Sequence, residues 1–141
     1  MPAHTAHSLL DLPKHQGLRL RLVDELRSKG IRDQAVLKAI MEVPRHFFLD
    51  QALAELAYQD KAMPIGEGQT ISQPYTVAFQ SELLAVEPHM KILEIGTGSG
   101  YQACILDQMG ARVFSVETIK SLHRSSQLLL KHLKCRAKLF V

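Results

Sequence analysis

The chain has 141 residues, which is enough for one domain with a hydrophobic core. Apolar residues make up 46% and charged residues 22%, as in an ordinary globular protein. The net charge is only +3 and the basic residues are scattered, so we expect no nucleic-acid partner. No apolar stretch approaches the roughly 18 residues of a membrane span and no signal peptide is recognisable, so we expect a cytoplasmic protein that does not bind membranes.

Cysteines and histidines give no metal-site pattern. Cys104 and Cys135 stand in unrelated sequence contexts without metal-ligand spacing, and we expect buried or inert thiols. His4, His7 and His15 are too loosely spaced near the N-terminus to form a metal site. The sequence therefore predicts no metal.

The N-terminal part divides into two zones. Residues 1–17 show little apolar periodicity and are predicted to be a flexible leader. Residues 18–88 are predicted to be a helical region on the substrate side of the protein. Its first helix ends at Gly30, and a second is capped by Asp33 and ends before Pro44.

The rest of the helical zone is more interrupted. A short helix is expected after Asp50, and residues 63–68, rich in glycine and proline, are predicted to be a loop. Pro74 suits the first turn of a further helix, which Ser72 or Gln73 can cap, because that position needs no backbone N–H.

Residues 89–141 alternate between strand and helix. Such alternation predicts an α/β fold with a parallel sheet. We expect strands near 91–95, 112–116 and 138–141, and helices near 100–109 and 119–134.

A glycine-rich turn follows the first of these strands. Its G-x-G-x-G spacing lacks the third glycine of the dinucleotide fingerprint, because Tyr101 stands there, and no P-loop lysine follows. Glu94, just before the turn, favours a positively charged ligand such as S-adenosylmethionine, with its sulfonium and amino groups. Glu117 ends the next strand, near the ~20-residue offset at which an acid binds ribose hydroxyls. The alternative is an ordinary α/β turn followed by a surface glutamate.

Residues 18–141 resemble the protein-L-isoaspartate O-methyltransferases. The resemblance depends on Val43-Pro-Arg45, Pro64-Ile-Gly66, Gln69-Thr-Ile-Ser72-Gln-Pro74, Leu93-Glu-Ile-Gly-Thr-Gly-Ser-Gly-Tyr-Gln102 and Ser115-Val-Glu117. These enzymes use S-adenosylmethionine to methylate the α-carboxylate of L-isoaspartyl residues in damaged proteins, which starts their repair. The resemblance implies a Rossmann-like class I methyltransferase fold, of which residues 89–141 form the first half of the cofactor-binding domain.

The resemblance also implies the roles of individual residues. It makes Ser72 the catalytic residue, whose hydroxyl would hold the isoaspartyl carboxylate toward the methyl group. The alternative for Ser72 is a plain helix cap. The implied substrate-binding residues are Thr70, Ile71 and Gln73. The implied cofactor-binding residues are Glu94, Gly96, Thr97, Gly98, Ser99, Gly100 and Glu117.

Two departures from the family pattern bear on function. Thr118 stands where the family usually carries arginine, and the family's Gly-Asp-Gly loop would fall after Val141. Only the first three parallel strands are therefore expected, and the free edge of the first strand suggests a truncated form that forms homo-oligomers. Another class I methyltransferase, or a non-catalytic cofactor-binding or interaction module, remain alternatives. A hydrolase is disfavoured because no G-x-S-x-G elbow is present.

Overall fold

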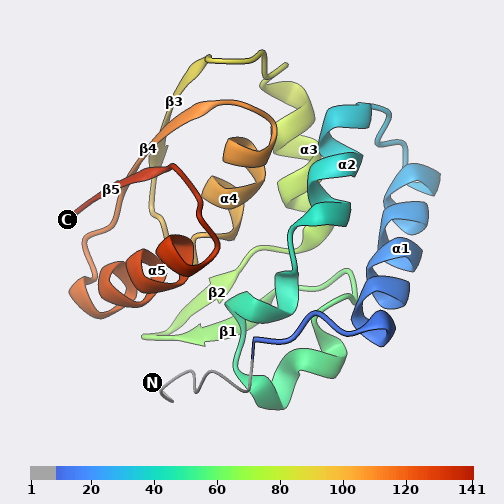
Figure 1. Ribbon diagram of the computed structural model, residues 1–141, viewed down its shortest axis with the longest axis horizontal. Coiled ribbons are helices and arrows are strands. Elements are labelled where there is room, and N and C mark those ends of the chain that lie inside the picture. Colours follow the sequence, from blue (N-terminus) through green and yellow to red (C-terminus); the bar gives the residue numbers. More distant parts are fainter. Residues whose placement is uncertain (1–8) are drawn as a thin grey trace.

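The computed structural model describes residues 9–141, which form a three-stranded parallel sheet, a set of helices and a small antiparallel hairpin (Figure 1). The N-terminal helices are α1 (Pro13–Ser28) and α2 (Gln34–Glu42), followed by the 3₁₀ helices η2 (Arg45–Phe48) and η3 (Gln51–Leu56). The hairpin consists of β1 (Met63–Gly66) and β2 (Gln69–Ile71), and α3 (Pro74–Leu83) follows it. The α/β part consists of β3 (Lys91–Ile95), α4 (Tyr101–Gln108), β4 (Arg112–Val116), α5 (Lys120–His132) and β5 (Lys138–Phe140).

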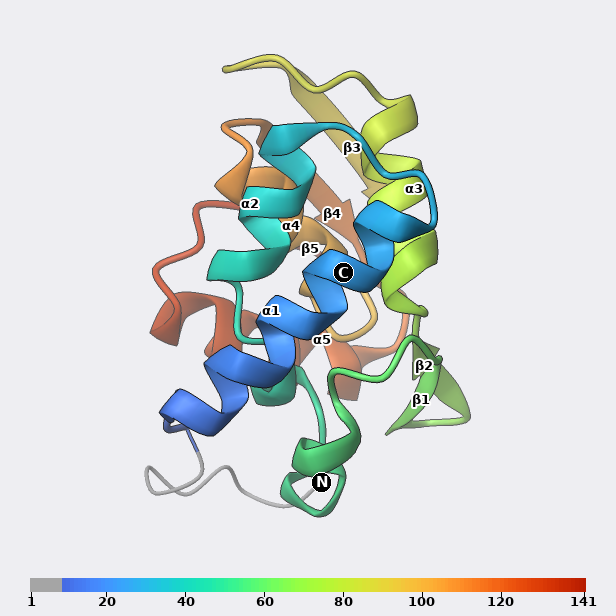
Figure 2. The same ribbon diagram turned by 90° about the vertical axis from the view of Figure 1, so that its right-hand side faces the viewer.

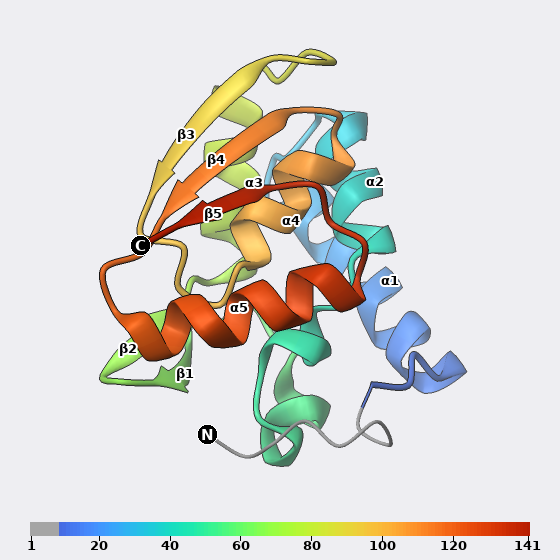
Figure 3. The ribbon, with the colours of Figure 1, turned by 60° about the vertical axis from the view of Figure 1, so that its left-hand side comes forward.

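The parallel sheet confirms the predicted α/β class. Its strand order is β3-β4-β5, and all pairs are parallel, with Lys91 opposite Arg112 and Val116 opposite Phe140. The connecting helices α4 and α5 lie on the same side of the sheet (Figure 3). The carboxyl ends of the strands therefore meet at one edge, beside the start of α4.

The other face of the sheet is open in the described part of the chain. Side chains alternate between the two faces along a strand, so Leu93 and Ile95 share one face of β3. Their exposed fractions are 66% and 77%, and Phe140 on β5 is 49% exposed. β4 is the one described strand that pairs with β3, which leaves the outer edge of β3 unpaired as predicted.

The N-terminal helices form a layer that packs on the α4 side of the molecule. α1 contacts both α2 and α3, and it crosses in front of them in Figure 2. The Asp33 carboxylate caps α2 as predicted, because it accepts hydrogen bonds from the Ala35 and Val36 amides. Leu22 and Leu26 of α1 are fully buried in the shared core.

The first helix begins earlier than the sequence predicted. Pro13 occupies its first position, where the fixed φ of proline suits a helix, so residues 13–17 are helical and do not belong to a leader. His4 and His7 lie outside the described residues. None of the described helices combines the length and the apolar character that a membrane crossing requires.

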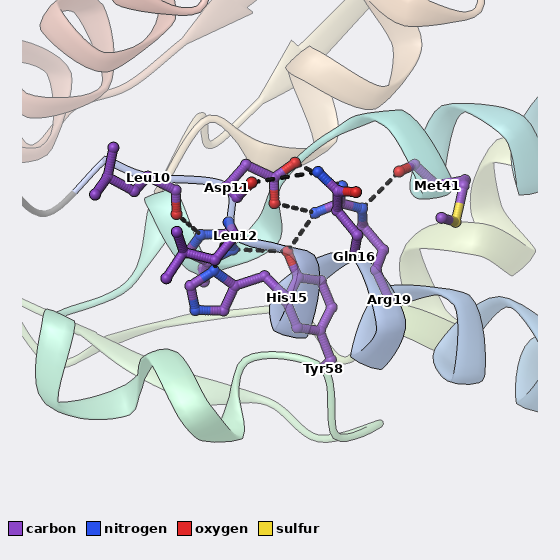
Figure 4. Close-up of polar contacts among 9 residues, drawn as sticks. Leu10, Asp11, Leu12, His15, Gln16, Arg19, Met41 and Tyr58 are labelled. Carbon is purple, nitrogen blue, oxygen red and sulfur yellow. Dashed lines mark hydrogen bonds and ion pairs between the residues drawn. The ribbon is translucent and has the colours of Figure 1, made fainter.

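A buried hydrogen-bond network anchors the segment before α1 (Figure 4). Arg19 donates to both carboxylate oxygens of Asp11, at 3.0 and 2.8 Å, and to the Tyr58 hydroxyl at 2.8 Å. Tyr58 in turn contacts His46 Nδ1 at 2.7 Å, and His46 Nε2 lies 3.0 Å from the Leu10 carbonyl oxygen. These long-range contacts explain why the chain is ordered where sequence periodicity is weak.

The predicted loop at 63–68 is wrong, since most of it is strand. Met63 pairs with Ile71 and Pro64 with Thr70, and the connection turns at Gly66, Glu67 and Gly68, which all have positive φ. The segment escaped prediction because each strand is very short and one contains proline. The hairpin places Thr70 and Ile71 directly before Ser72.

Candidate active site

The glycine turn has the backbone conformation that its sequence implied. Gly96, Gly98 and Gly100 have φ values of 91°, 55° and 88°, which side chains with a Cβ rarely adopt. The Gly96 amide donates to the Val116 carbonyl at 2.7 Å, so the turn is attached to the end of β4. Gly100 forms the N-cap of α4, and a Cβ there would lie 2.5 Å from Leu130 Cδ1, so the Leu130 side chain would have to shift.

Glu117 lies against this turn, although it is distant from it in sequence. Its Oε2 accepts a hydrogen bond from the Gly98 amide at 2.8 Å, and its Oε1 accepts one from the Ile119 amide at 2.9 Å. Only 6% of its surface is exposed. The carboxylate that ends β4 is therefore held beside the glycine turn at the end of β3.

A chain of hydroxyl groups connects the other predicted acid to the turn. Ser115 Oγ donates to Glu94 Oε1 at 2.5 Å, and the Thr97 hydroxyl lies 2.6 Å from Ser115 Oγ, to which it donates. Burial raises the pKa of Glu94 to about 7; the Ser115 hydrogen bond acts in the opposite direction, and the charge of Glu117 adds to the rise. A cationic ligand beside Glu94 would favour its ionised form. The sequence assigned Ser115 no role of its own, because its contact with Glu94 joins two neighbouring strands, β3 and β4.

Most of the predicted site residues line one cavity of about 330 Å³ between β3, α3 and the hairpin. The predicted residues that line it are Thr70, Ile71, Ser72, Glu94, Gly96, Thr97, Gly98 and Ser99. Gly100, Glu117 and Gln73 do not line it. Gln73 instead donates its side-chain amide to Asp60 Oδ2 at 3.1 Å.

The same cavity contains a residue to which the sequence assigned no role. Gln102, on the first turn of α4, lines it and donates to Ser81 Oγ at 2.9 Å. Its Oε1 is buried and has no hydrogen-bond partner among the described residues. Its place directly after the glycine turn is the signal that could have identified it.

A second cavity, of about 380 Å³, lies on the other side of the turn. It is lined mainly by apolar side chains of η2, η3, β1 and α5. The two cavities share Gly98 and Ser99. The glycine turn is therefore common to both cavities, and Glu94 and the Ser72 segment line the smaller one.

Ser72 is not a helix cap. The N-cap of α3 is Gln73, and no side chain caps this described helix. Ser72 is exposed and lines the smaller cavity, and its backbone carbonyl accepts a hydrogen bond from Arg45 Nη2 at 3.0 Å. Its hydroxyl is thus available to a ligand while its backbone is held.

The described residues include one cluster with metal-ligand atoms, at Asp11, His15 and His46, where these atoms lie within 4.8 Å of one another. Both ring nitrogens of His46 are already hydrogen-bonded, and the Asp11 carboxylate is paired with Arg19. The His15 ring stacks on that of His46 with centroids 3.9 Å apart, and its Nδ1 accepts a hydrogen bond from the N-cap amide of α1. This donor set serves the anchoring network and does not fit a metal ion.

The two cysteines are closer to one another than their sequence contexts suggested. Cys104 is buried on α4, and Cys135 follows α5. The neighbouring Cys135 thiol, together with burial, raises the pKa of Cys104, and the neighbouring Cys104 thiol lowers the pKa of Cys135. Neither thiol reaches the cavity beside Ser72.

Comparison with known families identifies this arrangement. Residues 18–141 match the family model described as protein-L-isoaspartate(D-aspartate) O-methyltransferase. The chain belongs to this family. The match spans the motifs at Val43–Arg45, Gln69–Pro74 and Leu93–Gln102, and it confirms the resemblance inferred from them.

Individual members of the family are longer than this chain. A protein-L-isoaspartate O-methyltransferase of Cytophaga hutchinsonii is 59% identical over 126 residues, which are 89% of this chain and 57% of the relative. One of Flavobacterium johnsoniae is 57% identical over 128 residues, 91% of this chain and 60% of the relative. The chain thus spans somewhat more than half the length of these family members.

Solved structures of the family share the fold. One protein-L-isoaspartate O-methyltransferase superposes with a TM-score of 0.77 at 29% identity, over 87% of this chain and 41% of its own. A Plasmodium falciparum family member, in complex with S-adenosyl-L-homocysteine, superposes with a TM-score of 0.71 at 25% identity, over 90% of this chain and 62% of its own. The Rossmann-like methyltransferase fold predicted from the sequence is therefore confirmed.

Proposed function

We propose that this chain binds S-adenosylmethionine at its glycine turn and serves a protein that methylates the α-carboxylate of L-isoaspartyl residues in damaged proteins and peptides. The observation that carries the proposal is the single cavity in which Ser72, Glu94 and the glycine turn meet. Family membership supports the same reaction. Because the chain spans only part of its relatives' length, the activity is proposed for the protein as a whole.

The residues around the turn fit the proposed cofactor. S-adenosylmethionine carries an ammonium group, ribose hydroxyls and a sulfonium whose methyl group is electrophilic. Glu94 offers a half-buried carboxylate to a cationic group, and Glu117 offers carboxylate oxygens to hydroxyls beside the Gly98 amide. Positive φ values at the glycines permit a close approach of ligand to backbone. We propose that Thr97 and Ser99, which belong to the same turn, border the bound cofactor, and that Gly100 starts α4.

The chemistry needs little from the protein beyond positioning. An isoaspartyl α-carboxylate is ionised at neutral pH and is already a nucleophile, so no strong base is required. We assign Ser72 the role of donating a hydrogen bond to that carboxylate and holding it in line for attack. Thr70 and Ile71 would border the bound peptide, and Gln73 would act through its backbone, since its side chain is bound to Asp60.

Self-association is proposed as well. The free edge of β3 and the exposed Leu93 and Ile95 present backbone groups and apolar surface to which a second copy of the chain could add. Sheet edges of this kind promote pairing between chains.

Two measurements test the function. Isothermal titration of the chain with S-adenosylhomocysteine should give micromolar or tighter binding, and transfer of a labelled methyl group should favour an isoaspartyl peptide over the matching aspartyl peptide. Binding without transfer would indicate a cofactor-binding module, and transfer to both peptides alike would indicate a different methyltransferase. Absence of both would contradict the proposal.

A further inference from the structure

Arg45 is the most deeply buried charged side chain of the described residues, with an exposed fraction of 0%. It extends from η2 and donates three hydrogen bonds, all to backbone carbonyl oxygens. Nε donates to Ala57 at 2.9 Å, and Nη2 donates to Lys61 at 3.2 Å and to Ser72 at 3.0 Å. One side chain thus connects three loop segments.

This arrangement is unusual for a buried cation. Burial lowers the pKa of Arg45, and no carboxylate accepts a hydrogen bond from it within the described residues. A cation without a paired anion is costly to bury, so an apolar side chain would fill the same space more favourably. The guanidinium instead satisfies carbonyl groups that would otherwise be buried without partners, and its planar fork reaches positions that a lysine ammonium cannot.

A second side chain holds the residues that follow Ser72. Asp60 Oδ1 accepts a hydrogen bond from the Tyr75 amide at 2.8 Å, and Oδ2 accepts one from the Gln73 side chain at 3.1 Å. Burial acts to raise the pKa of Asp60, but hydrogen bonds from Lys29, the Tyr75 amide and Gln73 lower it overall. Arg45 therefore holds the Ser72 carbonyl, and Asp60 holds the two residues Gln73 and Tyr75 that follow in the chain.

Arg45 also contacts the cofactor side of the site. Its guanidinium carbon lies 5.0 Å from the ring centroid of Tyr101, the first residue of α4 after the glycine turn. The Tyr101 ring is buried and packs edge-on against Phe48, three residues after Arg45. The same guanidinium thus touches both the segment of the proposed catalytic serine and the helix that starts at the proposed cofactor turn.

We propose that Arg45 is a positioning residue that fixes Ser72 relative to the glycine turn, and so aligns the substrate carboxylate with the methyl group. The inference rests on the proposed function of Ser72. It assigns Arg45 no contact with substrate or cofactor. Its effect is to set the distance between two segments that are far apart in sequence.

The test compares Arg45→Lys with Arg19→Lys. Arg19→Lys is the structural control. Arg19 is also buried and donates to a backbone carbonyl, that of Met41, but it does not contact the Ser72 segment. Arg45→Lys should lower kcat for an isoaspartyl peptide by about tenfold to a hundredfold, the range expected for a misplacement near 1 Å. Its affinity for S-adenosylhomocysteine should stay within about twofold of the wild-type value. Amides of residues 72–75 should also exchange hydrogen faster in Arg45→Lys than in Arg19→Lys.

Equal kcat and equal exchange at residues 72–75 in the two variants would overturn the inference. If the wild-type chain neither binds S-adenosylhomocysteine nor transfers methyl groups, the proposed function fails, and the exchange comparison still decides whether Arg45 holds the segment. If Arg45→Lys does not fold, the role of Arg45 can be tested by NMR on the wild-type protein. Its Arg45 Nε–H resonance should then shift on addition of an isoaspartyl peptide more than that of Arg19, and an unshifted resonance would contradict the role.

Discussion

Ser72 lines the cavity beside the glycine turn, while Arg45 holds its backbone carbonyl. A hydroxyl in this position can orient a carboxylate without removing a proton from it. In the proposed reaction, it would contribute a single hydrogen bond to a charged group. The role that we propose for Ser72 is therefore substrate alignment.

Ser72→Ala should lower the rate of methyl transfer to an isoaspartyl peptide by about tenfold, equivalent to about 1.4 kcal/mol in the transition state. Binding of S-adenosylhomocysteine should change much less. Kinetics and calorimetry on the same preparation measure both effects. Ser28→Ala, at an exposed serine of α1, is the control. Unchanged transfer in Ser72→Ala would remove Ser72 from the reaction.

Glu94 should make the ligand-free protein less stable as the pH rises above about 4.5. Its pKa in the folded protein is about 7, above the ordinary value of 4.5, so the folded state holds this proton more tightly than the unfolded state. The resulting stability is complete below about pH 4.5 and is lost as the pH rises through 7. The loss amounts to at most about 3 kcal/mol by pH 8, at 1.36 kcal/mol per pKa unit.

Glu94→Gln should abolish this dependence and weaken cofactor binding. Urea unfolding at pH 5 and pH 8 should show a smaller drop in stability for the variant than for the wild type. The control is Glu87→Gln, at an exposed carboxylate before β3. Parallel pH profiles for wild type and Glu94→Gln would show that the Glu94 carboxyl does not carry the extra proton.

The strand, glycine turn and helix from β3 to α4 form the element on which the site depends. Gly100 joins the turn to α4 in a left-handed conformation and lies against Leu130 of α5. An added Cβ at this position would force the Leu130 side chain to shift. The glycine is thus needed both for conformation and for packing.

Gly100→Ala should destabilise the protein by about 1–3 kcal/mol, because it adds strain at positive φ and a clash with Leu130. Gly17→Ala is the matched control. Gly17 lies within α1, and an added Cβ there meets nothing within 4 Å. The control should stabilise the protein by about 0.5–1 kcal/mol, since alanine favours helix interiors. Thermal or urea unfolding distinguishes the two, and equal effects would refute the packing argument.

The molecule as a whole is asymmetric about its sheet. Helices cover one face, while the opposite face and the outer edge of β3 are exposed in the described residues (Figure 3). An unpaired edge beside apolar side chains favours association between copies.

Leu93→Lys should therefore increase the monomer fraction in sedimentation velocity at a fixed protein concentration. A charge on this face disfavours both strand addition and apolar contact. Leu20→Lys, at an exposed leucine of α1 away from the sheet, should leave the distribution unchanged. A wild-type chain that stays monomeric at high concentration would contradict the proposed self-association.

Sequence patterns predicted the elements that depend on local chemistry. The strands at 91–95 and 112–116, the cap at Asp33 and the glycine turn agree with the structure, because each follows from periodicity or from a conformational preference of neighbouring residues. The hairpin of β1 and β2 and the helical start at Pro13 were missed. Both are stabilised by contacts with distant parts of the chain, which no local pattern records.

By itself, then, the sequence determined the α/β class, the family and the residues that could carry the chemistry, because these depend on residue type and spacing along the chain. Only the tertiary structure decided how those residues meet. Ser115 reaches Glu94 across 21 residues, and Arg45 reaches the Ser72 carbonyl across 27. Such contacts depend on how strands and helices pack, and packing is set by the whole core rather than by any one segment.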